Sequence, residues 1–189
     1  MRFDTISNLT FICIFSTMIP EKYYEPYFEV IQTDSDIEIR QYSENIIAKT
    51  SLRDGDIGQN NSMFRILADY IFGNNLERKQ IPMTTPVVTK YNDNNYEMIF
   101  FMLDSKEIKH LPKPLNKNVI LEKFSLNKVV AIKFSWWASE NNIAKHDRIL
   151  RKYIDENNLE VISDLIVAQY DPPFTLPNYR RNELMYQIK

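Results

Sequence analysis

The chain is poor in the residues from which many catalytic and metal sites are built. Its 189 residues include one cysteine, Cys13, three glycines and two histidines. A single cysteine excludes an intrachain disulfide and a zinc site made of cysteines. The sequence also lacks a glycine-rich phosphate loop, a Gly-x-Ser-x-Gly elbow and a His-Glu-x-x-His helix. Three common signatures, those of nucleotide-binding proteins, serine hydrolases and zinc proteases, are therefore absent.

Positive charge is not concentrated anywhere along the chain. There are 23 Lys and Arg against 25 Asp and Glu, a formal net charge of −2, and no basic block. Because nucleic-acid binding depends on basic patches that contact phosphates, we expect no nucleic-acid partner. The chain is 44% hydrophobic and 13% aromatic, which is enough for a sizeable core.

One stretch of the sequence occurs twice. Arg65–Ile71 (RILADYI) returns 83 residues later as Arg148–Ile154 (RILRKYI). Both copies have apolar residues at helical spacing, and Gly73 with the two asparagines after it supplies a left-handed stop for the first helix. The predicted stripes are Met63, Ile66, Leu67, Tyr70 and Ile71 in the first helix and Ile149, Leu150, Tyr153 and Ile154 in the second. The match indicates a duplicated unit.

The strands predicted around the two helices correspond in the same way. Ahead of each helix, two apolar runs with a short turn predict a β-hairpin, and two more strands follow the helix. The pairs are Ile37–Ser43 with Val119–Ser125, Ile46–Ala48 with Val129–Ala131, Val87–Tyr91 with Ile166–Tyr170, and Tyr96–Phe101 with Asn182–Gln187. Eight strands and two helices in this order predict an α+β fold with a closed or nearly closed antiparallel sheet. Since neither half could bury enough apolar surface alone, we expect one domain over 21–189, with repeat halves at about 27–104 and 117–189.

The N-terminal residues 1–20 form a separate apolar segment. Leu9–Ile19 has no charge, is too short for a spanning helix, and has the length of a signal-peptide core. Arg2 is offset by Asp4, and no Ala-x-Ala cleavage site follows. Two interpretations stay open: an export or membrane-associated segment, or a plain tail. Localisation is accordingly open between cytoplasmic and exported, and a membrane partner is expected only if this segment is retained.

Four motifs together resemble the SOUL haem-binding protein family over about Tyr24 to Lys189. They are Ile37–Tyr42 (IEIRQY), Phe64–Asn75, Ile81–Val87 (IPMTTPV), and Tyr170–Pro173 with Arg180–Glu183. The resemblance implies a distorted eight-stranded antiparallel β-barrel of two βαββ repeats flanked by two helices, similar to the effector-binding domains of drug-responsive transcription regulators. It also implies non-covalent binding of haem or another porphyrin.

The family pattern further implies an apolar groove beside the first helix, with basic groups near the propionates. Carried onto this sequence, the expected contacts are Met63, Leu67, Tyr70, Ile71 and Met83, with Arg65 and Arg40 as the basic residues. Some members have a histidine just after the Glu-Ile-Arg motif as a proposed iron ligand.

Gln41 stands at that place here and is a poor haem ligand. His146 and His110 remain weak candidates for a metal ligand. The plainer interpretations are a residue near the start of a helix for His146 and a loop surface residue for His110. We therefore expect tetrapyrrole binding without the axial histidine.

Other features have both structural and functional interpretations. Ile81–Pro86 forms a rigid turn or the mouth of a cavity. Arg180–Glu183 forms either a buried polar network that pins the last strand or a carboxylate site. Of the adjacent Trp136 and Trp137, one is expected in the core and the other exposed. Two alternative functions stay open: an effector-binding or protein-interaction module for another amphiphile, and a tetrapyrrole-modifying or hydrolytic enzyme that uses Glu183.

Overall fold

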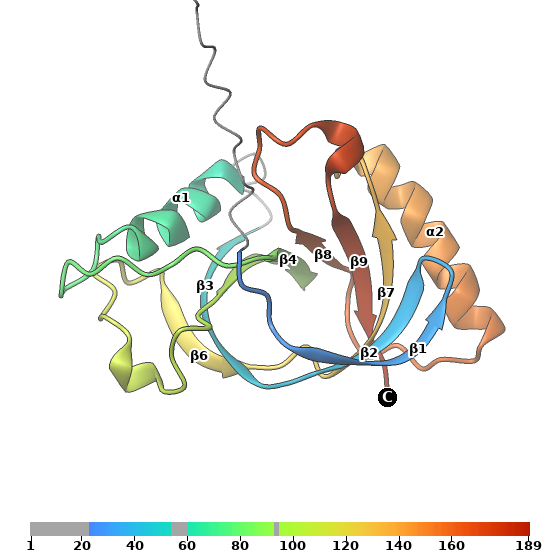
Figure 1. Ribbon diagram of the computed structural model, residues 1–189, viewed down its shortest axis with the longest axis horizontal. Helices are drawn as coiled ribbons and strands as arrows, with labels where there is room; N and C mark the ends of the chain where they lie inside the picture. The colour runs from blue at the N-terminus through green and yellow to red at the C-terminus, as the bar shows by residue number, and fades with distance from the viewer. Residues whose placement is uncertain (1–22, 54–59, 93–94) are drawn as a thin grey trace, which may run out of the picture.

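The computed structural model describes residues 23–53, 60–92 and 95–189. Within these ranges the chain is an α+β protein, in which one antiparallel sheet of nine strands curls into a half-barrel and two α-helices pack on it (Figure 1). The strands are β1 (Phe28–Asp34), β2 (Ile37–Tyr42), β3 (Asn45–Arg53), β4 (Val87–Asn92), β5 (Asn95–Phe101), β6 (Ile120–Phe124), β7 (Lys128–Phe134), β8 (Ile166–Gln169) and β9 (Asn182–Gln187). The helices are α1 (Asn60–Ile71) and α2 (Glu140–Glu156), with two short 3-10 helices, η2 (Ile108–His110) and η3 (Pro177–Tyr179).

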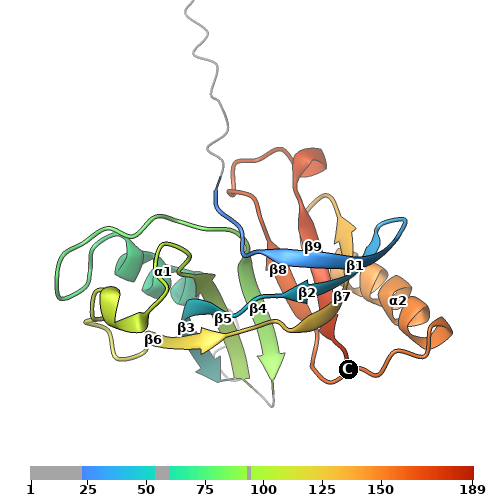
Figure 2. The ribbon, with the colours of Figure 1, turned by 60° about the horizontal axis from the view of Figure 1, so that its bottom comes forward.

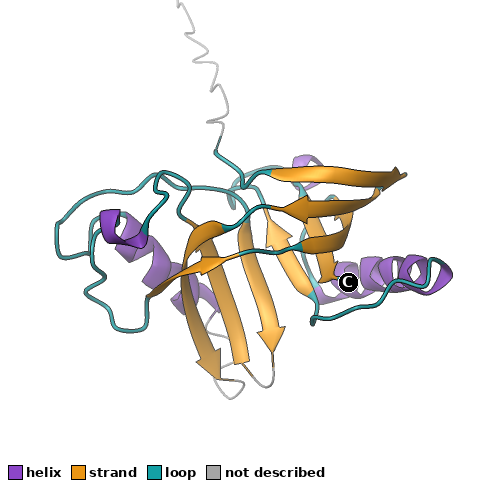
Figure 3. Cartoon of the chain, turned by 90° about the horizontal axis from the view of Figure 1, so that it is seen from below, coloured by secondary structure: helices purple, strands orange, loops and turns teal. Residues whose placement is uncertain are grey.

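The strands follow the order β1-β2-β7-β9-β8-β4-β5-β3-β6 across the sheet. The edge strands are β1 and β6, so the sheet curls without closing, as the view from below shows (Figure 3). Instead of the predicted eight strands, the described residues form nine. The additional strand is β1, which pairs with β2 from Phe28↔Tyr42 to Asp34↔Ile37.

Both predicted hairpins are wrong. β2 pairs with β7, through contacts such as Ile39↔Val130, and β3 pairs with β6, through contacts such as Ile47↔Glu122. The short polar connections have the composition of hairpin turns. In the strand order, however, β2 lies near one edge and β3 near the other, and the same holds for β7 and β6, so each connection joins strands that are not neighbours (Figure 2). A local pattern shows where a strand ends and not which strand it pairs with. The first strand of each predicted hairpin therefore pairs with the other half of the chain: β2 pairs with β7, and β6 pairs with β3.

Alternate residues of the central strands face different cores. Ile47 of β3 faces the concave interior of the half-barrel, while Ile46 and Ala48 pack in the cluster beneath α1. In β7, Val130 and Ile132 likewise pack beneath α2, and the residues between them face the interior. Because these strands are buried on both faces, they are continuous apolar runs in the sequence.

The two helices pack on the outer face of the sheet. Helix α1 ends at Ile71, and Gly73 has φ of +107°, which confirms the predicted left-handed stop. Helix α2 buries Leu150, Tyr153 and Ile154, as predicted. Ile149 is wrongly placed in that stripe: it is 45% exposed, because the buried face of α2 turns away from this position.

The N-terminal segment at residues 1–20 lies outside the described residues, so both interpretations of it stay predictions. In the part of the chain that is described, no helix has the length and apolar character needed to span a bilayer.

Candidate functional site

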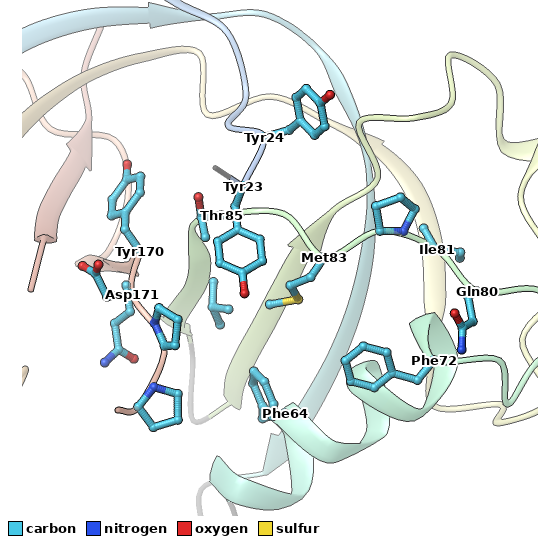
Figure 4. Close-up of a pocket in the computed structure, with 15 residues that line it drawn as sticks. Tyr23, Tyr24, Phe64, Phe72, Gln80, Ile81, Met83, Thr85, Tyr170 and Asp171 are labelled. Carbon is cyan, nitrogen blue, oxygen red and sulfur yellow. The ribbon is translucent and has the colours of Figure 1, made fainter. Parts of the chain in front are cut away.

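A groove of about 730 Å³ lies beside helix α1 (Figure 4). This volume is within the roughly 300–1,000 Å³ of clefts that bind small molecules. The lining residues are Tyr23, Tyr24, Phe64, Phe72, Gln80–Met83, Thr85, Val87 and Gln169–Pro173. Five of these residues are aromatic, and most of the others are apolar. The groove therefore offers aromatic and apolar walls to a flat ligand.

One wall of the groove is the segment that follows helix α1. The fully buried side chain of Asn75 folds this segment back: its Nδ2 donates to the carbonyl oxygens of Tyr70 (2.9 Å) and Lys79 (2.7 Å). The backbone N–H of Ile81 then donates to the carbonyl oxygen of the last helical residue at 2.8 Å. This turn fixes Gln80–Met83 beside the helix. Of the two interpretations of Ile81–Pro86, a rigid turn or the mouth of a cavity, the structure supports the second, since Ile81, Pro82, Met83 and Thr85 line the groove.

The opposite wall is the chain that leaves β8 at Tyr170. The backbone N–H of Arg181 donates to Oδ2 of Asp171 at 2.5 Å. The guanidinium of Arg180 donates to the carbonyl oxygen of Thr175 at 3.0 Å and to that of Pro173. These bonds hold the loop in place. Figure 4 shows Tyr170 and Asp171 across the groove from Phe72 and Gln80.

Asp171 is the only charged residue among the described residues that line the groove. Its side chain is half-buried, and within the described ranges it has no salt-bridge partner. The guanidinium of Arg181 pairs with Glu25 at 3.0 Å and with Glu183 at 2.9 Å instead. Among the described residues, the lining of the groove thus carries negative charge and no positive charge.

Of the residues that the sequence predicts as ligand contacts, Met83 lines the groove. The four apolar helix residues of that set are almost completely buried in the core beneath α1; they are Met63, Leu67, Tyr70 and Ile71. Tyr70 also donates its hydroxyl to the carbonyl oxygen of Pro112 at 2.8 Å, and burial raises its pKa to about 12. Arg65 is exposed on α1. Periodicity selects the buried stripe of the helix, whereas the groove is lined by Phe64 and Phe72, which are 42% and 63% exposed.

Arg40 lies in the interior of the half-barrel. It is fully buried, donates to both carboxylate oxygens of Glu183 at 2.6 and 3.1 Å, and bonds Glu38 at 2.7 Å. The hydroxyl of Tyr170 and the guanidinium of Arg181 also donate to Glu183, at 2.8 and 2.9 Å. The predicted polar network around Glu183 is therefore confirmed. Arg40 is paired within this network and is not among the residues that line the groove.

This network sets the protonation of its members. Burial by itself would raise the pKa of Glu183, but the hydrogen bonds and charge of Arg40, with the charge of Arg181, hold it below 4.5. Burial and the charge of Glu183 raise the pKa of Tyr170 well above 10. At neutral pH the network thus contains an ionised carboxylate and a neutral tyrosine. Glu183 is fully buried and is not among the residues that line the groove.

Neither His146 nor Gln41 approaches the groove. The ring of His146 stacks on Phe134 with centroids 4.5 Å apart, and its Nδ1 lies 2.8 Å from the carbonyl oxygen of Asn142. Gln41 is exposed on β2 and donates its amide to the carbonyl oxygen of Tyr42 at 3.2 Å.

His110 lines a second groove of about 600 Å³, whose lining shares Gln80–Pro82 with the first. Its Nε2 lies 3.9 Å from Oε2 of Glu107. Among the described residues there is no group of three or more His, Cys, Asp or Glu side chains placed to hold a metal ion.

The prediction that one of the two tryptophans is in the core is wrong. Trp136 and Trp137 are 61% and 51% exposed. They follow the end of β7, and Trp136 has φ of +73°, so the alternation of a strand does not apply to them. The backbone N–H of Trp136 donates to the carbonyl oxygen of Pro177 at 2.8 Å, and the guanidinium of Arg180 lies 3.9 Å over the ring of Trp137. The tryptophans thus form an exposed corner beside the loop of the groove.

Fold and groove together define a class: a half-barrel α+β protein with an aromatic-lined cleft on one side of helix α1. Residues 23–187 match the SOUL heme-binding protein family, nearly the whole chain. The chain belongs to this family, which confirms the resemblance found in its motifs. A search of curated proteins gives no match.

Several solved structures share the fold at low sequence identity. The C-terminal domain of EcmrR is 11% identical, with a TM-score of 0.63, covering 81% of this chain and 96% of that one. A hydrolase from Listeria innocua is 12% identical, with a TM-score of 0.55 and coverage of 84% and 94%. An uncharacterised conserved protein from Listeria innocua is 11% identical, with a TM-score of 0.62 and coverage of 82% and 92%. These similarities show the fold alone.

Proposed function

We propose that this protein binds a planar tetrapyrrole, haem or a metal-free porphyrin, in the groove beside helix α1. The observation that carries the proposal is a 730 Å³ groove with five aromatic residues in its lining, in a member of a family named for haem binding. Aromatic rings stack on flat conjugated faces and bury a large apolar area. The groove would hold the macrocycle between helix α1 and the loop after β8.

The predicted contact residues divide into two roles in this proposal. Met83 contacts the ligand directly, because its side chain lines the groove. Met63, Leu67, Tyr70 and Ile71 act from behind, since they seat α1 on the sheet and so position Phe64 and Phe72.

We further propose that no histidine ligates iron. His146 is packed against Phe134, and His110 lines the second groove. If the bound porphyrin contains iron, the groove offers Met83 and tyrosines, residue types that ligate haem iron in other proteins.

One observation favours a second candidate, an effector-binding module for another amphiphile. The groove has no basic side chain among its described lining residues, whereas the propionates of haem are anionic.

The family is defined by haem binding rather than by a reaction, and we propose that the chain is not an enzyme.

The repeat is also part of the proposal. The corresponding strands of the two halves are β2 and β6, β3 and β7, β4 and β8, and β5 and β9. When each strand is exchanged for its counterpart, the order from β2 to β6 across the sheet is the same order in the opposite direction. This pseudo-twofold order supports a duplicated unit of two strands, a helix and two further strands within one domain over 21–189.

Titration of the whole chain with haemin and with metal-free protoporphyrin tests the function. We expect saturable binding of both, followed by Soret absorbance and by quenching of tryptophan fluorescence, with a broad haem spectrum typical of weak ligation. His110→Ala and His146→Ala should leave both dissociation constants unchanged. The proposal fails if neither porphyrin saturates. A sharp six-coordinate spectrum that is lost in either histidine variant would contradict the absence of histidine ligation.

A matched pair of variants separates the groove from the core behind it. Phe72→Ala should weaken porphyrin binding about tenfold through lost stacking and change stability by less than about 0.5 kcal/mol, because Phe72 is 63% exposed. Leu67→Ala should lower the free energy of unfolding by about 2–5 kcal/mol through a core cavity, with little effect on the dissociation constant. Urea unfolding and the porphyrin titration measure both quantities. The reverse pattern would mean that the buried stripe, not the groove, holds the ligand.

A further inference from the structure

We infer that the groove selects flat aromatic ligands that carry positive charge. The inference rests on the proposed function, since it concerns the same groove and adds that, of two porphyrins with the same macrocycle, the cationic one binds more tightly. It starts from the charges of the lining: Asp171 is the one charged residue among the described residues there, and no lysine, arginine or histidine lines the groove.

The carboxylate of Asp171 has capacity left for a ligand. It accepts one hydrogen bond, from the backbone N–H of Arg181 to Oδ2. The two residues that follow, Pro172 and Pro173, have no N–H and so cannot donate to it. A carboxylate has about four lone-pair positions, of which one is used by a neutral donor.

The guanidinium of Arg181, the residue whose backbone N–H bonds this carboxylate, is paired with other groups. The guanidinium of Arg181 donates to both oxygens of Glu25 at 3.0 Å and to Glu183 at 2.9 and 3.1 Å. It also lies 3.7 Å over the ring of Tyr170. Two carboxylates and one aromatic face thus surround a single positive charge.

The aromatic walls add to the preference. Tyr24, Phe64 and Phe72 are 68%, 42% and 63% exposed, so their rings are open to a ligand. A cation over such a ring is attracted by about 0.5–1 kcal/mol at exposed sites, and more where water is excluded. An anionic group receives no comparable attraction from these faces and is repelled by Asp171.

Basic residues across the Gln80–Pro82 ridge do not reverse this balance. The second groove contains Lys79, Lys106 and His110, but Asp104 and Glu107 line it as well. An anionic porphyrin whose carboxylates reached over the ridge would meet these two carboxylates beside the two lysines.

The test uses two porphyrins with the same macrocycle and opposite charge. Tetrakis(N-methylpyridyl)porphyrin is cationic and tetrakis(sulfonatophenyl)porphyrin is anionic, and both are titrated into the full chain at low salt. We expect the cationic compound to bind at least about tenfold more tightly. Asp171→Asn should remove most of this preference. Asp69→Asn is the matched control, because it changes the net charge equally at an exposed position of α1 that does not line the groove.

The outcomes separate this inference from the proposed function. Equal binding of both porphyrins, or tighter binding of the anionic one, overturns the charge preference and leaves porphyrin binding intact. A loss of preference in Asp69→Asn as large as in Asp171→Asn overturns the role of Asp171, because the net charge alone would then explain it. If neither porphyrin saturates, the proposed function falls and the inference with it. Thermal melting of each variant confirms that it is folded before titration.

Discussion

Glu183→Gln is expected to lower the free energy of unfolding by about 3–5 kcal/mol, the usual cost of breaking a buried ion pair. Glu183 is fully buried and accepts from Arg40, Arg181 and the hydroxyl of Tyr170. Its replacement leaves Arg40, which is equally buried, with Glu38 as its remaining carboxylate partner. The penalty therefore comes chiefly from a positive charge that is desolvated and no longer balanced.

Urea unfolding of a set of variants measures this effect. Lys123→Ala is the control: it removes an exposed pair, Lys123–Glu44, whose side chains are 60% and 59% exposed, and should cost less than about 1 kcal/mol. The double variant Arg40→Met/Glu183→Leu should be more stable than the summed losses of Arg40→Met and Glu183→Leu, measured separately, predict, because it removes both charges together. A loss near that of the control in Glu183→Gln would show that the interior network contributes little.

The same network makes stability fall in acid. The pKa of Glu183 is held below 4.5 in the folded protein, while the unfolded chain has the ordinary value. A lowered folded pKa means that its contribution is complete above the unfolded pKa and is lost as pH falls through the folded pKa. The free energy of unfolding should thus decrease below about pH 4.5, and the decrease should be smaller in Glu183→Gln.

The positions of helices and strands follow from local patterns, and their partners do not. β2 and β9 lie at Ile37–Tyr42 and Asn182–Gln187, close to the predicted strands, because apolar runs and turn residues mark strand ends. The predicted hairpins failed because strand pairing depends on where the chain goes after the turn. Ser43 and Glu44 have the composition of a tight turn, yet they join strands that pair with β7 and β6.

The site was predicted less completely than the fold, for a related reason. Helical periodicity finds the residues that a helix buries, and Met63 and Leu67 are indeed fully buried. A groove is lined by side chains outside that stripe, such as Phe72, which no periodicity marks. The charge of the groove was also not predicted from the sequence. Arg40 was predicted as a ligand contact but is buried in the interior, and the charged residue that lines the groove is Asp171. Aromatic residues beside the predicted stripe, Phe64 and Phe72, were the feature of the sequence from which the groove could have been predicted.

The exchanged strands predict that neither half of the chain folds alone. Fragments 1–116 and 117–189, produced separately, should each lack a cooperative thermal transition. In the second fragment β6 has no partner, since it pairs with β3, and in both fragments the contacts β2–β7 and β4–β8 are lost. The concave core is also divided: Ile47 and Ile99 come from the first fragment, and Val129 and Met185 from the second.

Circular dichroism and thermal melting of each fragment, and of their equimolar mixture, test this prediction. The mixture should recover a cooperative transition, because three strand contacts and the Arg40–Glu183 ion pair re-form between the fragments. As a control, the folded chain carrying a protease site between residues 116 and 117 should stay associated after cleavage. A cooperative transition in either isolated fragment would show that one half is an independent domain. Failure of the half-chains to fold alone would instead show that each half depends on strands of the other, so that the groove beside α1 exists only in the complete chain.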